Sequence, residues 1–200
     1  MSEYSLTEEF FQSTKARLKE RASDFRFKHA LSVAETAEVI ARAYGVDERK
    51  ARLAGLIHDW DKDYSNTEIR LRATELGVAS DAELVESMPH MLHGMTGAVA
   101  LKQEFPEIGD DILQAVASHT SGALDMSDLD KVLYIADVIE PERQGRTRTG
   151  LSEGIGLVSL DELFFRTYQQ VFKHLVERGS RIHPDTIKVW NHSIMKMQQG

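Results

Sequence analysis

The sequence predicts an all-α protein, a compact helical bundle with one long loop before its last two helices. Apolar residues recur along most of the chain at the three- and four-residue spacing of helices, and no segment alternates like a strand. Residues that start and stop helices separate these stretches. The expected helices cover residues 5–21, 27–45, 47–58, 66–77, 81–86, 90–105, 108–119, 127–139, 160–178 and 184–197, and the helix that ends at 105 begins between 90 and 93.

In the first half of the chain, cap residues and glycines mark the helix ends. The second expected helix has a regular apolar face and stops at Gly45. Asp47 can cap the third helix, because its carboxylate accepts hydrogen bonds from the first free backbone N–H groups. Asn66 or Thr67 is expected to cap the fourth helix, which stops at Gly77.

In the second half, prolines and a serine set the boundaries. Pro89 ends the short helix over 81–86, and Pro106 follows the helix over 90–105. Ser127 is a good cap for the helix over 127–139, and Pro184 suits the first turn of the last helix. Residues 142–159 are rich in Gly, Arg, Thr and Ser, so we expect an irregular loop there.

The length and composition fit one soluble domain. We expect a single domain over 1–200, with an N-terminal helical extension (1–23), a metal-binding core (24–140), a loop (141–159) and C-terminal helices (160–200). The formal net charge of -8 argues against binding nucleic acid or an anionic membrane. No signal peptide or membrane-length apolar run is visible, and the absence of cysteine suits a reducing compartment, so we expect a cytoplasmic protein.

Several polar side chains fall on the apolar faces of the expected helices. His119 ends a stripe that begins at Ile112, and Asp137 lies on a stripe with Val132 and Leu133. A bare carboxylate buried there would cost several kcal/mol or more unless it were paired or bound to a cation. The inward-facing set is His29, His58, Asp59, His93, His119 and Asp137.

Taken singly, each of these histidines is better explained as a core residue satisfied by a hydrogen bond. Together the six have the composition of an imidazole and carboxylate metal site. Six ligands are too many for one catalytic ion with an open position, but they suit two ions bridged by one carboxylate. With no cysteine in the chain, iron or manganese is favoured over zinc or magnesium.

The His58-Asp59 dipeptide and the segments around it resemble the YqeK-type branch of the HD phosphohydrolase superfamily. The dipeptide alone is weak evidence, whereas the order and spacing of the other segments are more specific. Two positions depart from the usual pattern: Ser121 replaces a threonine, and Trp60 replaces a tyrosine. The matching segments are RFKH at 26–29, AGLIHD at 54–59, LHG at 92–94, HTSG at 119–122 and ADVIEP at 136–141.

The resemblance implies a di-iron-type centre and symmetrical hydrolysis of diadenosine tetraphosphate to two ADP. One ion would be bound by His29, His58, Asp59 and Asp137. The other would be bound by His93 and His119, with Asp59 bridging the two. We expect a metal-bridging hydroxide to attack an inner phosphorus, with ADP as the leaving group.

Phosphate charge also requires fixed cations. Lys62 and Arg143 are expected to act in catalysis beside Asp59, and Arg26, Lys62 and Arg143 to bind substrate. Without the resemblance, Lys62 and Arg143 would be read as solvated surface charges. Thr120 and Gly122 could place a hydroxyl and backbone N–H groups near phosphate, although Gly122 could equally be a simple helix stop.

Other roles are left open by the sequence. Arg146 and Arg148 lie in the same loop as Arg143 but are not assigned, and neither is His90. His174, His183 and His192 are not expected to bind metal.

Alternative functions are a nucleoside monophosphatase, a cyclic-nucleotide phosphodiesterase of the same superfamily, a non-catalytic nucleotide-binding module, or a purely structural helical scaffold. The apolar faces of the C-terminal helices are expected to pack in the core, with a homodimer interface as the alternative.

Overall fold

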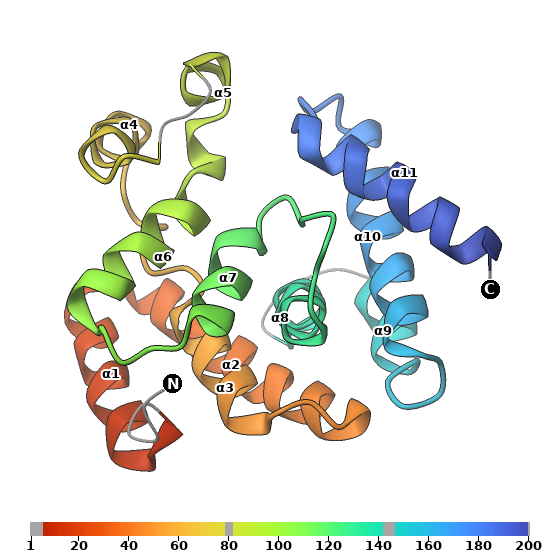
Figure 1. Cartoon of the computed structure of the whole chain (residues 1–200), viewed down its shortest axis with the longest axis horizontal. Coiled ribbons are helices and arrows are strands. Elements are labelled where there is room, and N and C mark those ends of the chain that lie inside the picture. Colours follow the sequence, from red (N-terminus) through yellow and green to blue (C-terminus); the bar gives the residue numbers. More distant parts are fainter. Residues whose placement is uncertain (1–5, 79–81, 142–146, 200) are drawn as a thin grey trace.

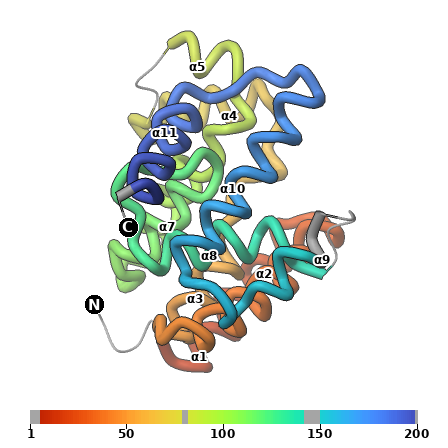
Figure 2. Tube along the Cα trace, turned by 90° about the vertical axis from the view of Figure 1, so that its right-hand side faces the viewer, coloured from red at the N-terminus to blue at the C-terminus, as the bar shows by residue number. Residues whose placement is uncertain are grey.

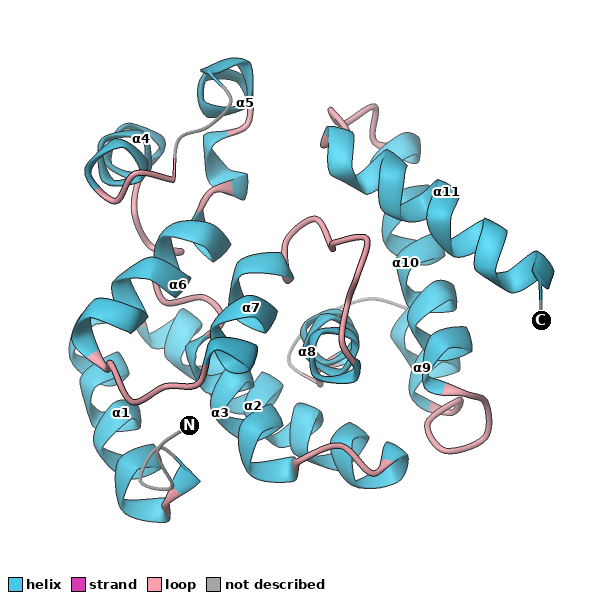
Figure 3. Ribbon diagram, viewed as in Figure 1, coloured by secondary structure: helices cyan, strands magenta, loops and turns pink. Residues whose placement is uncertain are grey.

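The computed structural model describes residues 6–78, 82–141 and 147–199, which form helices and connecting turns with no strand among them (Figure 3). The predicted all-α class is therefore confirmed for these residues. No helix in these ranges is both long enough and apolar enough to cross a membrane. The helices are α1 (Glu8–Arg21), α2 (Asp24–Tyr44), α3 (Glu48–Ile57), α4 (Asn66–Glu75), α5 (Ala82–Ser87), α6 (His93–Glu104), α7 (Asp110–Ser118), α8 (Asp128–Ile139), α9 (Thr147–Ser152), α10 (Leu160–Glu177) and α11 (Pro184–Gln199), with a 3-10 turn η2 (Pro89–Met91) before α6.

Helix α8 lies at the centre of the molecule, where Figure 1 views it nearly along its axis. It packs against α2, α3 and α7 on one side and against α9 and α10 on the other. Figure 2 shows α9, α10 and α11 in front of the other helices, covering this second side. The central position agrees with the sequence of α8, whose Val132, Leu133, Ile135 and Ala136 are fully buried.

Most predicted helix ends are confirmed, and the caps explain them. The side chains of Asp47 and Ser127 accept hydrogen bonds from backbone N–H groups at the starts of α3 and α8. Gly45 ends α2 with a positive φ of 70°, a left-handed conformation that favours glycine. The predicted cap of α4, Asn66 or Thr67, was one or two residues late, because the cap is Ser65, which forms a reciprocal capping box with Glu68.

One prediction about an irregular segment needs correction. The helix expected to begin between residues 90 and 93 does so as α6, at His93, directly after the 3-10 turn η2. The loop expected over 142–159, in contrast, contains the short helix α9. Leu151 in α9 is 6% exposed and belongs to the main core, so packing outweighs the poor helix propensity of its glycine and threonine neighbours.

Two glycines allow helices to approach closely and thereby bring distant histidines together. A Cβ at Gly55 would lie 2.7 Å from Ala34 Cα, so α3 lies almost directly against the backbone of α2. A Cβ at Gly94 would lie 2.9 Å from the carbonyl oxygen of Val116, so the start of α6 meets the end of α7 equally closely. The first approach positions α2 against α3, and the second positions α6 against α7.

Candidate metal centre

The six inward-facing residues predicted from the sequence lie together in one buried cluster. Asp59 is on the turn after α3, and its side chain is 8% exposed, whereas the side chain of Asp137 is 17% exposed. All four histidines are buried. The histidines come from α2 (His29), the end of α3 (His58), the first residue of α6 (His93) and the end of α7 (His119).

The two oxygens of Asp59 face different pairs of imidazoles. Its Oδ2 lies 3.5 Å from Nε2 of His58 and 3.7 Å from Nε2 of His29. Its Oδ1 lies 3.1 Å from Nε2 of His93 and 3.5 Å from Nε2 of His119. One carboxylate therefore joins two donor groups.

Asp137 belongs to the first donor group only. Its Oδ1 lies 3.1 Å from Nε2 of His29 and 3.7 Å from Nε2 of His58. Ligand atoms from these three residues all lie within 4.8 Å of one another, close enough to share one ion. A second such group contains His58, Asp59 and His119.

Backbone carbonyls fix the orientation of three of the imidazoles. Nδ1 of His58 lies 2.8 Å from the oxygen of Gly55, and Nδ1 of His119 lies 2.6 Å from that of Val116. Nδ1 of His93 lies 2.7 Å from the oxygen of His90. A carbonyl can only accept, so each Nδ1 carries the proton and each neutral ring presents Nε2 as an acceptor.

This arrangement leaves buried acceptors pointing at one another. Nε2 of His93 and Nε2 of His119 are 3.0 Å apart, and both lie near a carboxylate oxygen. Neutral rings with protonated Nδ1 atoms cannot donate across this gap, and buried polar atoms are rarely left unsatisfied. A cation resolves the conflict, so the donor set fits a divalent metal centre.

Burial keeps two of these imidazoles neutral. It lowers the pKa of His58 from 6.5 to about 4, and it lowers the pKa of His93 to about 4 as well. For His29, burial is also the largest effect and lowers the pKa, but Asp137, Asp59 and Glu140 together raise it. Burial would raise the pKa of Asp59, yet the surrounding His58, His119 and His93 hold it well below 3.8. The site therefore contains an ionised Asp59 and neutral His58 and His93 rings, the forms that bind metal.

The model of the HD domain family matches residues 26–142, a segment that includes all six cluster residues. This chain belongs to the HD domain family.

Named relatives extend the likeness over most of the chain. Symmetrical bis(5'-nucleosyl)-tetraphosphatases from Bacillus subtilis and Staphylococcus aureus are each 30% identical to it. The matches cover 88% and 90% of this chain and 93% of each relative. A solved structure, a predicted HD superfamily hydrolase involved in NAD metabolism from Clostridium acetobutylicum, is 30% identical with a TM-score of 0.86. That match covers 93% of this chain and 97% of the other.

Two of the three predicted phosphate-binding cations, Arg26 and Lys62, lie beside residues of the six-residue cluster. Nη1 of Arg26 is 3.2 Å from Oδ2 of Asp59, and its Nε is 3.7 Å from Asp63. Nζ of Lys62 is 3.4 Å from both ring nitrogens of His93, so the ammonium lies beside the imidazole. Arg143 lies outside the described residues, as does Arg146, and the side chain of Arg148 is also not described.

Thr120 and Gly122 lie in the turn that follows His119. The Thr120 hydroxyl is half-buried and donates weakly, at 3.4 Å, to the carbonyl of Met91. The N–H of Gly122 donates to Ser118 at 2.8 Å, and its φ of 76° lies in the left-handed region. A Cβ there would lie 3.2 Å from the ring of Tyr168, so turn geometry and packing explain this glycine.

Glu140 is a neighbour of the HD-domain site that was not predicted from the sequence. Its side chain is 2% exposed, and Oε1 lies 3.2 Å from Nδ1 of His29. Glu140 thus orients His29 as the carbonyls orient the other three histidines. The spacing in the sequence could have indicated Glu140, because this residue follows Asp137 by three positions and so continues the same helix face.

Asp61 was also missed. Its side chain is fully buried, and it pairs with Arg21 at 3.2 Å and with Arg72 at 2.6 Å. These ion pairs connect the turn after α3, which carries Asp59 and Asp61, to α1 and α4. No local sequence pattern predicts these two ion pairs, because the arginines lie 40 and 11 residues from Asp61.

The remaining histidines lie outside the cluster. His174 is exposed, and His192 is half-buried on α11. His183 is buried, and its Nδ1 accepts from the N–H of Asp185. The His90 side chain is exposed, although its carbonyl accepts from His93.

Proposed function

We propose that this HD-domain protein hydrolyses dinucleoside tetraphosphates symmetrically, converting diadenosine tetraphosphate and water to two ADP. The observation that carries the proposal is the division of Asp59 between two donor groups, which suits two ions on one phosphate chain. Relatives about 30% identical over most of their length bear the name of this activity.

We assign the ligands by these donor groups. His29, His58, Asp59 and Asp137 would hold one ion, and His93, His119 and Asp59 the other. Nitrogen and oxygen donors without thiolate favour iron, with manganese, zinc or magnesium as alternatives. When bound, such ions supply Lewis-acid chemistry and lower the pKa of water toward neutrality.

The chain's own cations would position and neutralise the tetraphosphate. In the described structure Arg26 pairs with Asp59, so phosphate would compete with that carboxylate for the guanidinium. Lys62 holds its ammonium beside His93, in the other donor group. We keep Arg143 as a third phosphate-binding cation and Thr120 as a hydroxyl contact. Water oxygen bonds to an inner phosphorus, the central P–O bond breaks, and ADP departs.

A nucleotide panel tests the proposal. The metal-loaded protein is assayed against diadenosine tetraphosphate, AMP and cyclic nucleotides. We expect it to hydrolyse the tetraphosphate best. Cleavage of AMP or of a cyclic nucleotide, with the tetraphosphate left intact, would replace this function with a monophosphatase or phosphodiesterase.

Two substitutions separate metal binding from phosphate binding. Asp59→Ala removes the shared ligand, so we expect loss of bound metal and of turnover. Lys62→Ala should keep its metal and lose at least about tenfold in rate, because one fixed charge on phosphate is removed. Elemental analysis and initial rates measure both. Wild-type rates in both variants would eliminate the site, and a metal-replete but inactive Lys62→Ala protein would rule out a purely structural metal.

A further inference from the structure

The proposed reaction sets a requirement for a second binding region. In a dinucleoside tetraphosphate cleaved at its centre, two phosphates separate each nucleoside from the breaking bond. A nucleoside must therefore bind beside the metal cluster and not within it. The pocket should be apolar, with a few polar groups to orient the base.

One cavity of about 490 Å³ is lined by residues that are close in sequence to His93 and His119. Its walls come from α5, η2, the start of α6, the end of α7 with the following turn, and the start of α11. Ser118 and Thr120, which flank the cluster residue His119, both line it. Met91 and Met95, two positions before and after His93, line it as well. The cavity thus borders the segments that carry His93 and His119, while the two histidines themselves are not among its lining residues.

The lining suits a heteroaromatic base. Met91, Met95, Ala117 and Pro184 supply apolar surface, and methionine sulfur packs well against aromatic rings. The volume falls within the range of about 300–1,000 Å³ that is usual for small-molecule sites. Ser118, Thr120 and Ser121 also line the cavity and add polar groups to it.

Gln114 offers a polar group of defined orientation. Its Nε2 donates to Oδ2 of Asp130 at 3.0 Å, and a carboxylate can only accept, so this contact fixes which way the amide is turned. The amide oxygen of Gln114 can then accept a hydrogen bond from a ligand in the cavity, and the second N–H of Nε2 remains a donor. An oxygen acceptor matches the exocyclic amino group of adenine.

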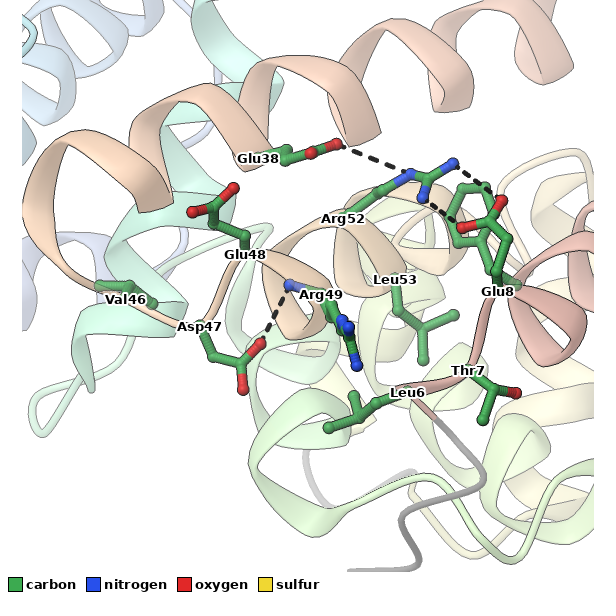
Figure 4. A pocket seen from close by; sticks show the side chains of 11 residues that line it. Leu6, Thr7, Glu8, Glu38, Val46, Asp47, Glu48, Arg49, Arg52 and Leu53 are labelled. Atoms are coloured by element: carbon green, nitrogen blue, oxygen red, sulfur yellow. Dashed lines mark hydrogen bonds and ion pairs between the residues drawn. The ribbon is translucent and has the colours of Figure 1, made fainter.

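A second hollow, of about 740 Å³, does not suit a nucleotide (Figure 4). It lies around the start of α3, at the end of that helix opposite His58. Its walls carry four carboxylates, Glu8, Glu38, Asp47 and Glu48, against the guanidinium groups of Arg49 and Arg52. Arg52 already pairs with Glu8 at 2.7 Å and with Glu38 at 3.7 Å. Phosphate would meet net negative charge there.

We propose that the cavity between α7 and α11 binds one nucleoside of the substrate, with its base between the methionines and Pro184. This inference rests on the proposed function, since it identifies where one half of that substrate lies. Gln114 would accept a hydrogen bond from the base. The ribose would lie toward Thr120, on the path to the metals.

Substitutions that fill the cavity test this assignment through the affinity for ligands. Ala117→Phe places a ring in the cavity, and Ala117→Ser keeps its volume. In the metal-loaded protein, calorimetry gives the dissociation constants of ADP and of inorganic pyrophosphate. We expect Ala117→Phe to weaken ADP binding by about tenfold or more while pyrophosphate binding stays the same. Ala117→Ser should match the wild type for both ligands.

Controls separate this effect from damage to the fold or metals. Ala16→Phe makes the same exchange at an exposed position of α1 and should change nothing. Metal content and thermal unfolding are measured for each variant, and Ala123→Phe fills the cavity from the turn if Ala117→Phe loses metal. Unchanged ADP binding in the filled variant, or equal weakening of ADP and pyrophosphate, would overturn the nucleoside pocket. A wild-type protein that binds ADP in this cavity but cannot hydrolyse the tetraphosphate would instead overturn the proposed function.

Discussion

The imidazoles of the cluster are fixed by their second nitrogens. Three of them donate through Nδ1 to a carbonyl three residues earlier in the chain, from a position at or near a helix end. The fourth, His29, is mid-helix, and the carboxylate of Glu140 takes the place of the carbonyl. Glu140 is therefore the one orienting group that a side-chain substitution can remove.

Glu140→Gln tests that role. The amide keeps the shape of the side chain but removes the negative charge beside His29, whose pKa Glu140 helps to raise. Loss of such an orienting partner typically weakens metal affinity by about 10–100-fold. Competition with a metal-binding dye measures this affinity, and Glu177→Gln, on an exposed surface of α10, is the control. Unchanged affinity in Glu140→Gln would show that Glu140 does not position His29.

The metal-free protein should lose stability in mild acid. His58 and His93 have pKa values of about 4 when folded, against 6.5 ordinarily. Between these values the unfolded chain binds more protons, so the free energy of unfolding falls as the pH is lowered from about 6.5 to about 4. The raised pKa of His29 offsets part of this loss.

Urea unfolding of chelator-treated protein at pH 7 and pH 5 measures this change. His93→Gln should reduce the pH dependence, and the exposed His174→Gln should leave it intact. Equal stability of the wild type at both pH values would contradict the expectation.

At the scale of helices, the site depends on two close helix pairs. Gly55 brings α3 against α2, and Gly94 brings α6 against α7. Each pair delivers two histidines, and Asp59, on the turn after α3, lies between the pairs. Helix packing therefore sets the distance between the two donor groups.

Gly55→Ala tests this dependence. The new methyl would lie 2.7 Å from Ala34 Cα, so the helices must separate. We expect a loss of about 1–3 kcal/mol in the free energy of unfolding, as for other overpacked cores. Weaker metal binding should accompany it, because His29 and His58 move apart. Chemical denaturation and metal titration measure the two effects.

Gly150→Ala is the matched control. A methyl group added at this glycine would meet no atom within 4 Å, and the residue is within helix α9. Alanine there should be neutral or stabilise by up to about 1 kcal/mol. If Gly55→Ala behaved like Gly150→Ala, close approach of α2 and α3 would not be what holds the site together.

For the whole molecule, the all-α class and most helix limits could be predicted from the sequence because helical spacing and capping are local. The inward direction of His119 and Asp137 followed from the same spacing. The six residues were grouped as one metal site because all were expected to face inward, but their division between two ions, with Asp59 bridging, came from the resemblance, since no local pattern brings residues 29 and 137 together. The pairing of Asp61 with Arg21 and Arg72 could not be predicted, because only the tertiary structure joins them. Helix α9 was missed because burial of Leu151, not its local sequence, supports it.

The central claim is that the two-ion site hydrolyses diadenosine tetraphosphate symmetrically. The products formed from this substrate test the claim most directly. Metal-loaded protein is incubated with diadenosine tetraphosphate in ¹⁸O-labelled water, and the nucleotides are separated and weighed by mass spectrometry. The two-ion site predicts ADP as the sole product, with one of each two ADP molecules carrying a single ¹⁸O on its terminal phosphate. Formation of ATP with AMP, or recovery of intact substrate, would contradict it.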